Sequence, residues 1–434
     1  MGDVVTEIRP VKRHEVVEYL RALPFANGLP SWEPYPAAWH GGAEAWPCPR
    51  PPATREQLES WVDELMEDDT FRPQAAIVDG KVVGATAMLS LEVTAPGLRV
   101  VPFGGVTGTG VIATHRRQGL LRGMMQAMFT DALERGEAIA ELSASEGSIY
   151  GRFGFSPATL RIRWEIERWD ARLVDADPDP GSLELVDAAT AREVWPVIFD
   201  RVRRARVGEI TARKGRWSDL SDEAKGTDGP LRYLVHRDAA GQVDGIANYR
   251  LPCSTSPDGV GVLVVEALEA LTDEAYRAMW SLLLDFDLTR KVVAPARPGD
   301  EPLRWMLHNP RAMRVTRQSD NLWVRVLDLP NALISRGYDT DGHLRIAVEK
   351  DPECPHNIGT WELEISEGEA ECRRVDRAAD LALDIQALGS LYLGGMSAAA
   401  LARAGKIRPQ EADAVATLSR LFRTDPEPFN SIGF

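Results

Sequence analysis

The sequence predicts a mixed α/β (α+β) protein built from several domains. Its 434 residues are too many for one hydrophobic core, because single cores stop growing at roughly 250–300 residues. Stretches with the two-residue period of strands alternate with stretches of helical period along the chain. Composition and pattern separate three segments, the first ending near Pro157 and the third beginning near Leu327. We therefore expect three domains that each combine strands and helices.

The first segment contains a strand, a glycine turn and a helix in direct succession. Small and β-branched residues run from Val106 to Ile112, which favours a strand. After Gly119, apolar residues recur at helical spacing and predict one buried helix face; they are Leu120, Leu121, Met124, Met125, Met128, Ala132 and Leu133. A second strand is predicted at Ile139 to Ala144.

The second and third segments show weaker patterns of the same kind. In the second segment the patterns predict strands at 160–166, 231–236, 245–250 and 260–265, and helices at 191–202 and 273–287. In the third they predict a helix near Leu327, strands at 344–348 and 360–365, and a last helix at 411–422. A similar order of elements in the first two segments is compatible with a duplicated fold.

Composition and charge exclude several classes of protein. The formal net charge of −15 disfavours nucleic acid as a partner, because phosphate binding needs a basic surface. No apolar run approaches the ~20 residues that span a bilayer, and Met1 to Val17 lacks an apolar signal-peptide core. The four cysteines are scattered and no histidines have ligand spacing, which argues against disulfides and a metal site. We expect a cytoplasmic protein without a membrane partner.

The turn before the predicted helix has the features of a phosphate-binding site. The first N–H groups of a helix lack internal partners and carry partial positive charge, so they bind anions. Gly119 lets the backbone approach a pyrophosphate closely, and Arg117 and Arg122 add positive charge. The spacing alone is weak evidence, because Gln242–Ala247 matches a similar pattern between two hairpin-like strands. Only the first copy has a helix behind it.

The wider motif resembles the GNAT superfamily of N-acetyltransferases. Val111–Met125 resembles its motif A, and Tyr150–Phe155 resembles the Tyr-x-x-x-Gly-Phe of its motif B. Leu121 stands where most GNAT proteins have Gly or Ala. In this departure the chain resembles the Eis (enhanced intracellular survival) family. The flanking stretches His115-Arg116-Arg117 and Ala144–Gly147 resemble the same family. The abrupt ending Ile432-Gly433-Phe434 also resembles this family.

The resemblance implies a fold, a cofactor and a set of site residues. It implies a GNAT domain at 1–157, a second GNAT-like domain at 158–325 and a sterol-carrier-protein-like domain at 326–434. Acetyl-CoA would be the acetyl donor, and no metal is implied. The residues that would contact it are Thr109, Gly110 and Val111 beside the pantetheine arm, Arg117, Gln118, Gly119, Leu120, Leu121 and Arg122 around the pyrophosphate, and Ser145 and Glu146 at the end of the second strand. Tyr150 would be the general acid and the Phe434 carboxylate the general base.

Amine acetylation needs such an acid and base. The acceptor amine must lose a proton to attack the thioester, and the departing thiolate must gain one. A phenol of pKa about 10 can donate to that thiolate only when placed beside it. An α-carboxylate of pKa about 3.5 is a weak base, so it would orient the ammonium group or relay its proton through water. Alternatively, Tyr150 is a core residue, Phe434 only docks, or Glu146 is the base.

The acceptor and the assembly follow only from the resemblance. Eis-like enzymes acetylate amines such as aminoglycosides, and protein lysines have been proposed; the acidic composition suits a cationic substrate. A homohexamer is implied as well. The runner-up is a non-catalytic protein that senses acyl-CoA or carries lipid. The role of the proline- and tryptophan-rich stretch Pro24–Pro52 is open between a functional loop and a rigid surface loop.

Overall fold

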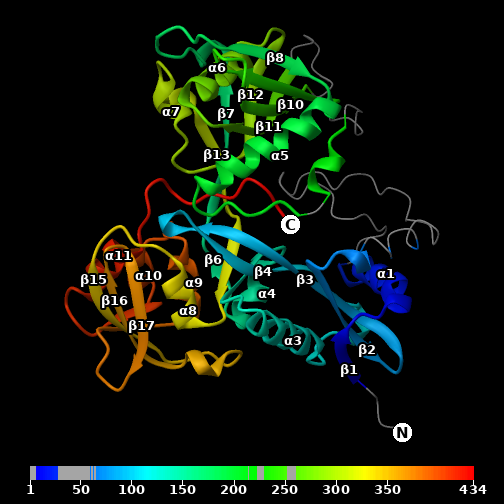
Figure 1. Ribbon diagram of the computed structural model, residues 1–434, viewed down its shortest axis with the longest axis vertical. Helices are drawn as coiled ribbons and strands as arrows, with labels where there is room; N and C mark the ends of the chain where they lie inside the picture. The colour runs from blue at the N-terminus through cyan, green and yellow to red at the C-terminus, as the bar shows by residue number, and fades with distance from the viewer. Residues whose placement is uncertain are drawn as a thin grey trace. The chain divides into compact units, whose positions relative to one another are not determined.

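The computed structural model describes residues 6–27, 59, 62, 65–213, 215–221, 229–251 and 261–434. Contacts group the chain into two compact units (Figure 1). Unit 1 comprises residues 1–158, 322–424 and 434, and unit 2 comprises residues 159–321 and 425–433. Most of the stretch Pro24–Pro52 lies outside the described residues.

The first sheet of unit 1 has seven strands in the order β1-β2-β3-β4-β5-β14-β6. Its strands are β1 (Thr6–Pro10), β2 (Phe71–Val78), β3 (Lys81–Ala95), β4 (Arg99–Val111), β5 (Ile139–Ser143), β14 (Leu322–Val326) and β6 (Ser156–Pro157). β4 and β5 are parallel neighbours, whereas the other pairings are antiparallel. β14 comes from far along the chain and pairs with β5 and β6, so later sequence completes this sheet.

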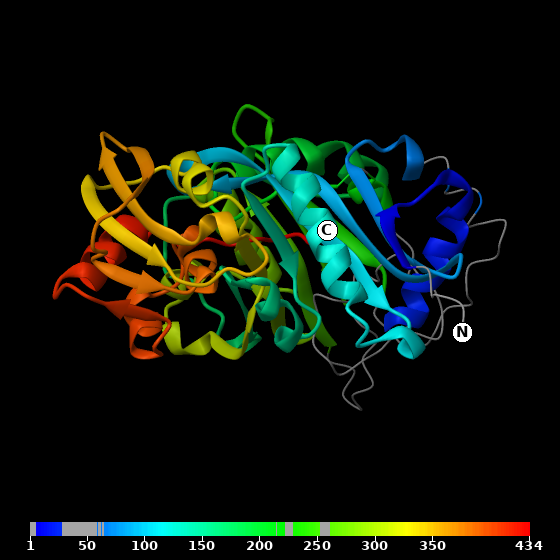
Figure 2. The ribbon, with the colours of Figure 1, turned by 90° about the horizontal axis from the view of Figure 1, so that it is seen from below.

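Two helices cover opposite faces of this sheet (Figure 2). On β2, Ala75 and Ile77 pack in one cluster with α1 (Val16–Asn27). The alternate residues Ala76 and Val78 pack with Met124 of α3 (Leu120–Glu134). Successive side chains of a strand point to opposite faces, so the apolar run of β2 serves both helices.

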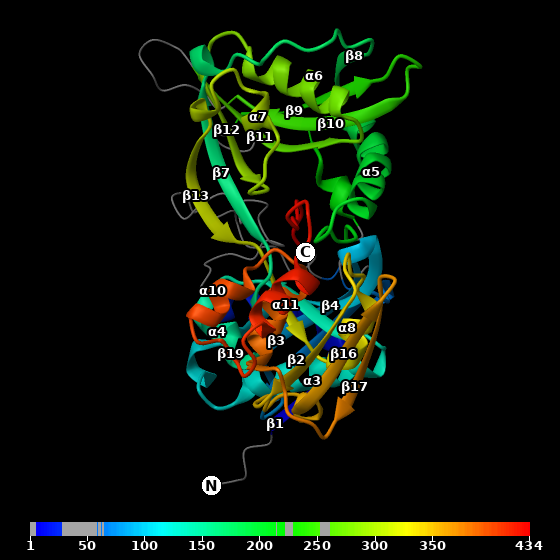
Figure 3. The same cartoon turned by 90° about the vertical axis from the view of Figure 1, so that its left-hand side faces the viewer.

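The second sheet of unit 1 has the order β17-β16-β15-β18-β19, and its strands β16 and β17 lie side by side in Figure 3. Its strands are β15 (Gly342–Val348), β16 (Gly359–Ser366), β17 (Glu369–Val375), β18 (Leu381–Leu383) and β19 (Ile407–Pro409), and its helices are α8 (Leu329–Ser335), α9 (Ile385–Tyr392), α10 (Ala398–Arg403) and α11 (Ala414–Phe422). α9 packs against β14 and β6, which ties this part of the chain to the first sheet. α8 begins where expected, because Asp328 accepts a bond from Asn331 N at 3.3 Å.

Unit 2 has one seven-stranded sheet in the order β13-β7-β12-β11-β10-β9-β8. Its strands are β7 (Leu160–Glu167), β8 (Ser182–Val186), β9 (Leu231–Arg237), β10 (Val243–Arg250), β11 (Gly261–Ala270), β12 (Thr289–Arg297) and β13 (Arg314–Asp320), and its helices are α5 (Ala188–Arg204), α6 (Asp273–Leu284) and α7 (Leu303–Met306). Trp280 of α6 and Trp164 of β7 meet in its core with ring centroids 5.1 Å apart.

The predicted elements are present with shifted ends. α3 begins directly after Gly119 as predicted, and the Gln242–Ala247 copy lies on β10 without a following helix. α5 starts three residues before Ala191, because Asp187 accepts a capping bond from Thr190 N at 2.8 Å. The prediction that a helix continues to Asp287 was wrong, since α6 ends at Leu284 and Leu288 has a positive φ of 56°. No helix among the described residues is long and apolar enough to cross a membrane.

Candidate active site

The centre of the candidate site is the point where β4 and β5 stop pairing. Within the described residues their parallel ladder covers only Phe103–Gly105 on β4 and Ile139–Glu141 on β5. β4 then continues to Val111 along β3. Thr109, Gly110 and Val111 therefore lie beyond the ladder, where the backbone of β4 can pair with an extended ligand.

A β-bulge fixes the conformation of this part of β4. The register with β3 shifts so that Gly108 and Thr109 together face Thr86. Gly108 has a φ of 58°, which only glycine adopts without strain. The hydroxyl groups of Thr86 and Thr109 are 2.7 Å apart and hydrogen-bonded. The bulge thus changes the direction in which the backbone and side chains of Thr109 and Gly110 point, compared with a regular strand.

The turn into α3 has the geometry of an anion site. Arg117 and Gly119 are both left-handed, with φ values of 64° and 81°, and Gly119 caps the helix. Among the described residues, no atom lies within 4 Å of the position that a Cβ atom would take at Gly119, so the turn is open at this point. Backbone bonding of the helix begins at Gly123 N, 3.0 Å from Gly119 O, and the N–H groups of Leu120, Leu121 and Arg122 precede it. Gln118 is exposed beside them.

Arg122 has a partner that the sequence did not indicate. Its Nη1 lies 3.1 Å from Oε1 of Glu353, whose side chain is only 1% exposed. Gln126 Nε2 donates to the other carboxylate oxygen at 3.2 Å. Arg122 itself is half exposed. Its guanidinium is therefore oriented at the first turn of α3 by an acid from the third segment, with part of its surface left for a ligand.

The second motif follows β5. Ser145 and Glu146 are exposed after the strand, and Tyr150 ends the short helix α4 (Gly147–Tyr150). The Tyr150 side chain is buried, with its ring centroid 6.3 Å from that of Phe155. This burial agrees with a core position and with a ring held for chemistry, so packing alone does not separate the two hypotheses.

Residues of the third segment contact the loop that follows Tyr150. Gln386 of α9 donates to Gly151 O, and Ser390 donates to Ser156 Oγ at 2.8 Å. Gly154 has a φ of 88°, and a Cβ atom there would lie 2.7 Å from the Arg325 guanidinium. Glycine is therefore required at 154 both by conformation and by space. The loop that carries Tyr150 is fixed by residues that a local motif does not include.

Phe434 lies on β4 beside the end of the ladder. Its ring is 5.8 Å from that of Phe103, and a Cβ atom at Gly105 would lie 2.9 Å from its Cε2 atom. Thr107 Oγ1 donates to a terminal carboxylate oxygen at 3.4 Å. Phe103, Gly105 and Thr107 alternate along the strand and so share one face of the sheet. The chain terminus therefore meets the strand that carries Thr109–Val111.

Sequence reasoning also missed a buried acid on this face. Glu141 of β5 pairs in register with Gly105, and paired residues of a parallel ladder project to the same side. Its side chain is fully buried, and neither carboxylate oxygen has a hydrogen-bond partner among the described residues. Burial raises the pKa of Glu141 well above its usual value. The adjacent glycines 104 and 105 were the one available signal, since glycine inside a strand often marks close approach.

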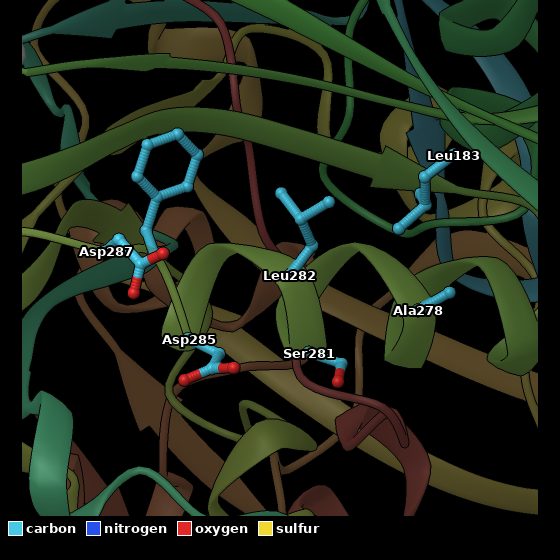
Figure 4. A pocket seen from close by; sticks show the side chains of 7 residues that line it. Leu183, Ala278, Ser281, Leu282, Asp285 and Asp287 are labelled. Carbon is cyan, nitrogen blue, oxygen red and sulfur yellow. The ribbon is translucent and has the colours of Figure 1, made fainter.

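Unit 2 has a surface feature of its own. A surface hollow of unit 2 along α6 is lined by Leu183, Ala278, Ser281, Leu282, Asp285, Phe286 and Asp287 (Figure 4). Asp285 and Asp287 pair there with Arg168 at 3.1 and 3.0 Å. Among the described residues, no group of three or more His, Cys, Asp or Glu side chains is arranged to hold a metal ion.

Comparison with known proteins defines the class of this site. Two families of acetyltransferase (GNAT) domains match residues 35–158 and 209–326, and the sterol carrier protein domain family matches residues 329–431. The crystal structure of Eis1 from Mycobacterium abscessus superimposes with a TM-score of 0.82 and 31% identity, over 99% of this chain and all of that chain. The protein is therefore an N-acetyltransferase with two GNAT domains followed by a sterol-carrier-like domain.

Sequence relatives narrow this class to one family. An uncharacterised N-acetyltransferase of Streptomyces coelicolor is 36% identical over 81% of this chain and 86% of its own length. The N-acetyltransferase Eis of Mycobacterium tuberculosis is 33% identical over 80% of this chain and 84% of its own length. The chain belongs to the Eis family of GNAT N-acetyltransferases, whose fold implies acetyl-CoA as the acetyl donor.

Proposed function

We propose that this enzyme transfers the acetyl group of acetyl-CoA directly to an amine of a cationic substrate. The observation that carries the proposal is the combination, in one unit, of an open glycine-capped turn before α3 and a chain terminus bonded to Thr107 on the adjoining strand. The first supplies a site for the CoA phosphates, and the second supplies a negative charge for an ammonium group.

The residues around Gly119 would hold the pyrophosphate. The N–H groups of the first turn of α3 provide donors and partial positive charge, and Arg117 and Arg122 provide full charges. Thr109–Val111 would pair with the pantetheine arm, with Ser145 and Glu146 at the end of β5 beside it. The end of the β4–β5 ladder at Gly105 supports this role, because β5 does not pair with β4 at Thr109–Val111.

The chemistry requires the nitrogen to lose two protons and the CoA thiolate to gain one. The ammonium group loses a proton, and the free amine attacks the thioester carbonyl carbon. A C–N bond forms and the C–S bond breaks, and the nitrogen gives up a second proton. The CoA thiolate receives one proton, for which Tyr150 is the proposed donor, so the overall reaction releases one proton.

We assign the role of base to the Phe434 carboxylate, acting by orienting the ammonium group and passing its proton to water. The bond from Thr107 and the ring contact with Phe103 support a fixed carboxylate rather than a mobile one. Glu146 is the alternative base. It is exposed, whereas the terminal carboxylate is held by neighbouring side chains.

The acceptor is proposed from charge and family. The net charge of −15 favours cationic substrates such as aminoglycosides, other polyamines or protein lysines. A non-catalytic acyl-CoA sensor or lipid carrier is the competing function. A cytoplasmic homohexamer with domains at 1–157, 158–325 and 326–434 completes the proposal.

One experiment tests the function directly. The protein is incubated with acetyl-CoA and a panel of aminoglycosides, polyamines and lysine peptides while release of the CoA thiol is followed. We expect acceptor-dependent thiol release together with an acetylated product of the corresponding mass. Binding of acetyl-CoA without turnover of any acceptor would favour the sensor instead.

A further inference from the structure

The last residues of the chain before Phe434 form a strap that is anchored within unit 2. We call residues 425–433 the strap. Phe429 is fully buried, and its N–H donates to Val207 O at 2.9 Å. Asn321 Nδ2 donates to Asn430 O at 2.7 Å. Gly208 has a φ of 90°, and a Cβ atom there would lie 3.0 Å from the Phe429 backbone. The strap therefore packs directly against Gly208.

The carboxylate of Glu209 contacts the strap at Ser431, which is nearer to the chain terminus than Phe429 and Asn430. Glu209 is fully buried, and its Oε1 atom accepts a hydrogen bond from Ser431 N at 3.0 Å. Its Oε2 atom has no hydrogen-bond partner among the described residues. Arg206 Nη1 lies 3.6 Å from Glu209, and the same guanidinium lies 5.9 Å from the ring centroid of Phe429. Glu209 and Arg206 therefore hold the backbone and a ring of the strap together.

The short distance along the chain links this anchor to the terminus. Only Ile432 and Gly433 separate Ser431 from Phe434. At about 3.3–3.6 Å per extended residue, a fixed Ser431 restricts Phe434 to within about 10–11 Å of it. Without the anchor, the strap could move at Ser431, and only the contacts of Phe434 with Thr107 and Phe103 would hold the terminal carboxylate.

We propose that Glu209 is a positioning residue for acetyl transfer, which acts by fixing Ser431 and thereby the carboxylate of Phe434. This proposal rests on the proposed function, because it needs the terminal carboxylate to take part in the reaction. It gives the second GNAT domain a specific task in catalysis. That domain contributes the residue that keeps the strap in place.

Two substitutions at Glu209 separate the hydrogen bond from the charge. Glu209→Ala removes the acceptor and leaves the Ser431 N–H buried and unpaired. Glu209→Gln removes the charge but keeps an acceptor oxygen of the same reach. We expect kcat to fall at least about tenfold in Glu209→Ala, with the acetyl-CoA Kd unchanged, and to return to within about threefold of the parent in Glu209→Gln.

A second measurement reports on the anchor without using activity. Carboxypeptidase A removes aromatic residues from a chain terminus, and the rate of phenylalanine release measures how freely Phe434 is presented. We expect release at least about tenfold faster from Glu209→Ala than from the parent or Glu209→Gln. Glu269→Ala is the matched control, because Glu269 is also buried and lies 3.4 Å from the same Arg206. It should lower thermal stability without accelerating release.

The outcomes show whether the positioning role of Glu209 fails alone or the proposed role of the terminal carboxylate fails as well. If trimming of Phe434 leaves the parent fully active, the terminal carboxylate is not the base and the proposed mechanism fails. If trimming abolishes turnover but Glu209→Ala changes neither kcat nor phenylalanine release, only the positioning role is overturned. Equal acceleration of release in Glu209→Ala and Glu269→Ala would also overturn it, because the effect would then reflect general loosening of unit 2.

Discussion

Tyr150 can be tested by removing a single oxygen atom. Tyr150→Phe keeps the ring that packs 6.3 Å from Phe155 and deletes only the proposed proton donor. We expect kcat to fall by about 10²–10⁴-fold with little change in acetyl-CoA affinity, since general acid catalysis contributes that range. Steady-state kinetics and calorimetry measure the two quantities.

Tyr392→Phe is a matched control for this substitution. Tyr392 is fully buried, and its hydroxyl group lies 3.3 Å from Ser335 Oγ, an interaction that the proposed mechanism does not use. Its loss should cost about 1 kcal/mol of stability and leave kcat unchanged. Equal kcat in Tyr150→Phe and the parent would move the acid role to another group.

Glu141 predicts a pH dependence of stability. Its pKa is raised well above the usual value by burial, whereas the unfolded chain titrates near about 4.3. Above that pH the folded state binds a proton that the unfolded state has lost, so stability falls as pH rises toward the folded pKa, by up to about 1.4 kcal/mol per pH unit. Glu141→Gln cannot titrate. Its stability advantage over the parent should therefore grow between pH 5 and pH 8 in urea unfolding, and parallel curves would contradict the assignment.

At this scale the sequence predicted residues with local signals and missed those with non-local partners. Gly119 and Tyr150 belong to short motifs whose spacing is visible in one stretch of chain. Thr107 and Glu353 became apparent only in the structure, because their partners Phe434 and Arg122 come from distant segments. A single sequence does not specify such pairs.

At the scale of elements, substitutions of the glycines at the two ends of α3 can be compared. Gly119→Val should weaken acetyl-CoA binding at least about tenfold, because a β-branched residue does not tolerate the φ of 81° and the turn must rearrange. No clash with a described residue contributes, since none of them has an atom within 4 Å of its Cβ position. Calorimetry with acetyl-CoA measures the effect.

Gly136 at the other end of α3 provides the control. It has a φ of 78°, and again no described residue has an atom within 4 Å of its Cβ position, so Gly136→Val imposes similar backbone strain. Both variants should lose comparable stability, while only Gly119→Val should lose affinity and both should keep the far-UV spectrum. Unaltered affinity in Gly119→Val would remove the phosphate-binding role from this turn.

Helices were predicted better than sheet order. The helical period of α3 is carried by one continuous run of residues, so its start and most of its buried face followed from the sequence, although Phe129 was missed and Leu121 and Leu133 are only partly buried. β14 is different, because its place between β5 and β6 depends on hydrogen bonds to strands laid down much earlier in the chain. Strand propensity does not state which edge a strand will join.

At the scale of the whole molecule, local patterns predicted three mixed α/β segments, and the order of domain types followed from the resemblance of the first segment's motifs to the Eis family. The division into 1–157, 158–325 and 326–434 stays a prediction. The contacts instead group β14 and α9 with the first sheet and the strap with unit 2. Those groupings arise from long-range packing, which composition and periodicity do not encode.

The assembly is a further prediction at this scale. The Eis resemblance implies a hexamer built from trimers, so light scattering should give a mass about six times that of the 47.8 kDa chain. Symmetric closed assemblies of this kind are common among soluble oligomers. A mass near 47.8 kDa throughout the micromolar range would contradict the prediction.

The terminus makes the strongest prediction for the molecule as a whole. A carboxylate bonded to Thr107 and fixed by the Phe434 ring is a preorganised charge. Appending two residues moves the terminal charge by about 7 Å and replaces it at Phe434 with a neutral peptide group. A C-terminal extension should therefore abolish turnover, and deletion of Phe434 should do the same.

The same extension placed at the N-terminus is the control, and it should leave kcat unchanged. All three proteins should bind acetyl-CoA with the parent's affinity, because the proposed phosphate site at Gly119 lies on a separate strand-and-helix turn of unit 1. Thiol-release kinetics and calorimetry on the same preparations separate lost chemistry from lost binding. Full activity in the C-terminally extended protein would reject the terminal carboxylate and leave Glu146 as the base to test next.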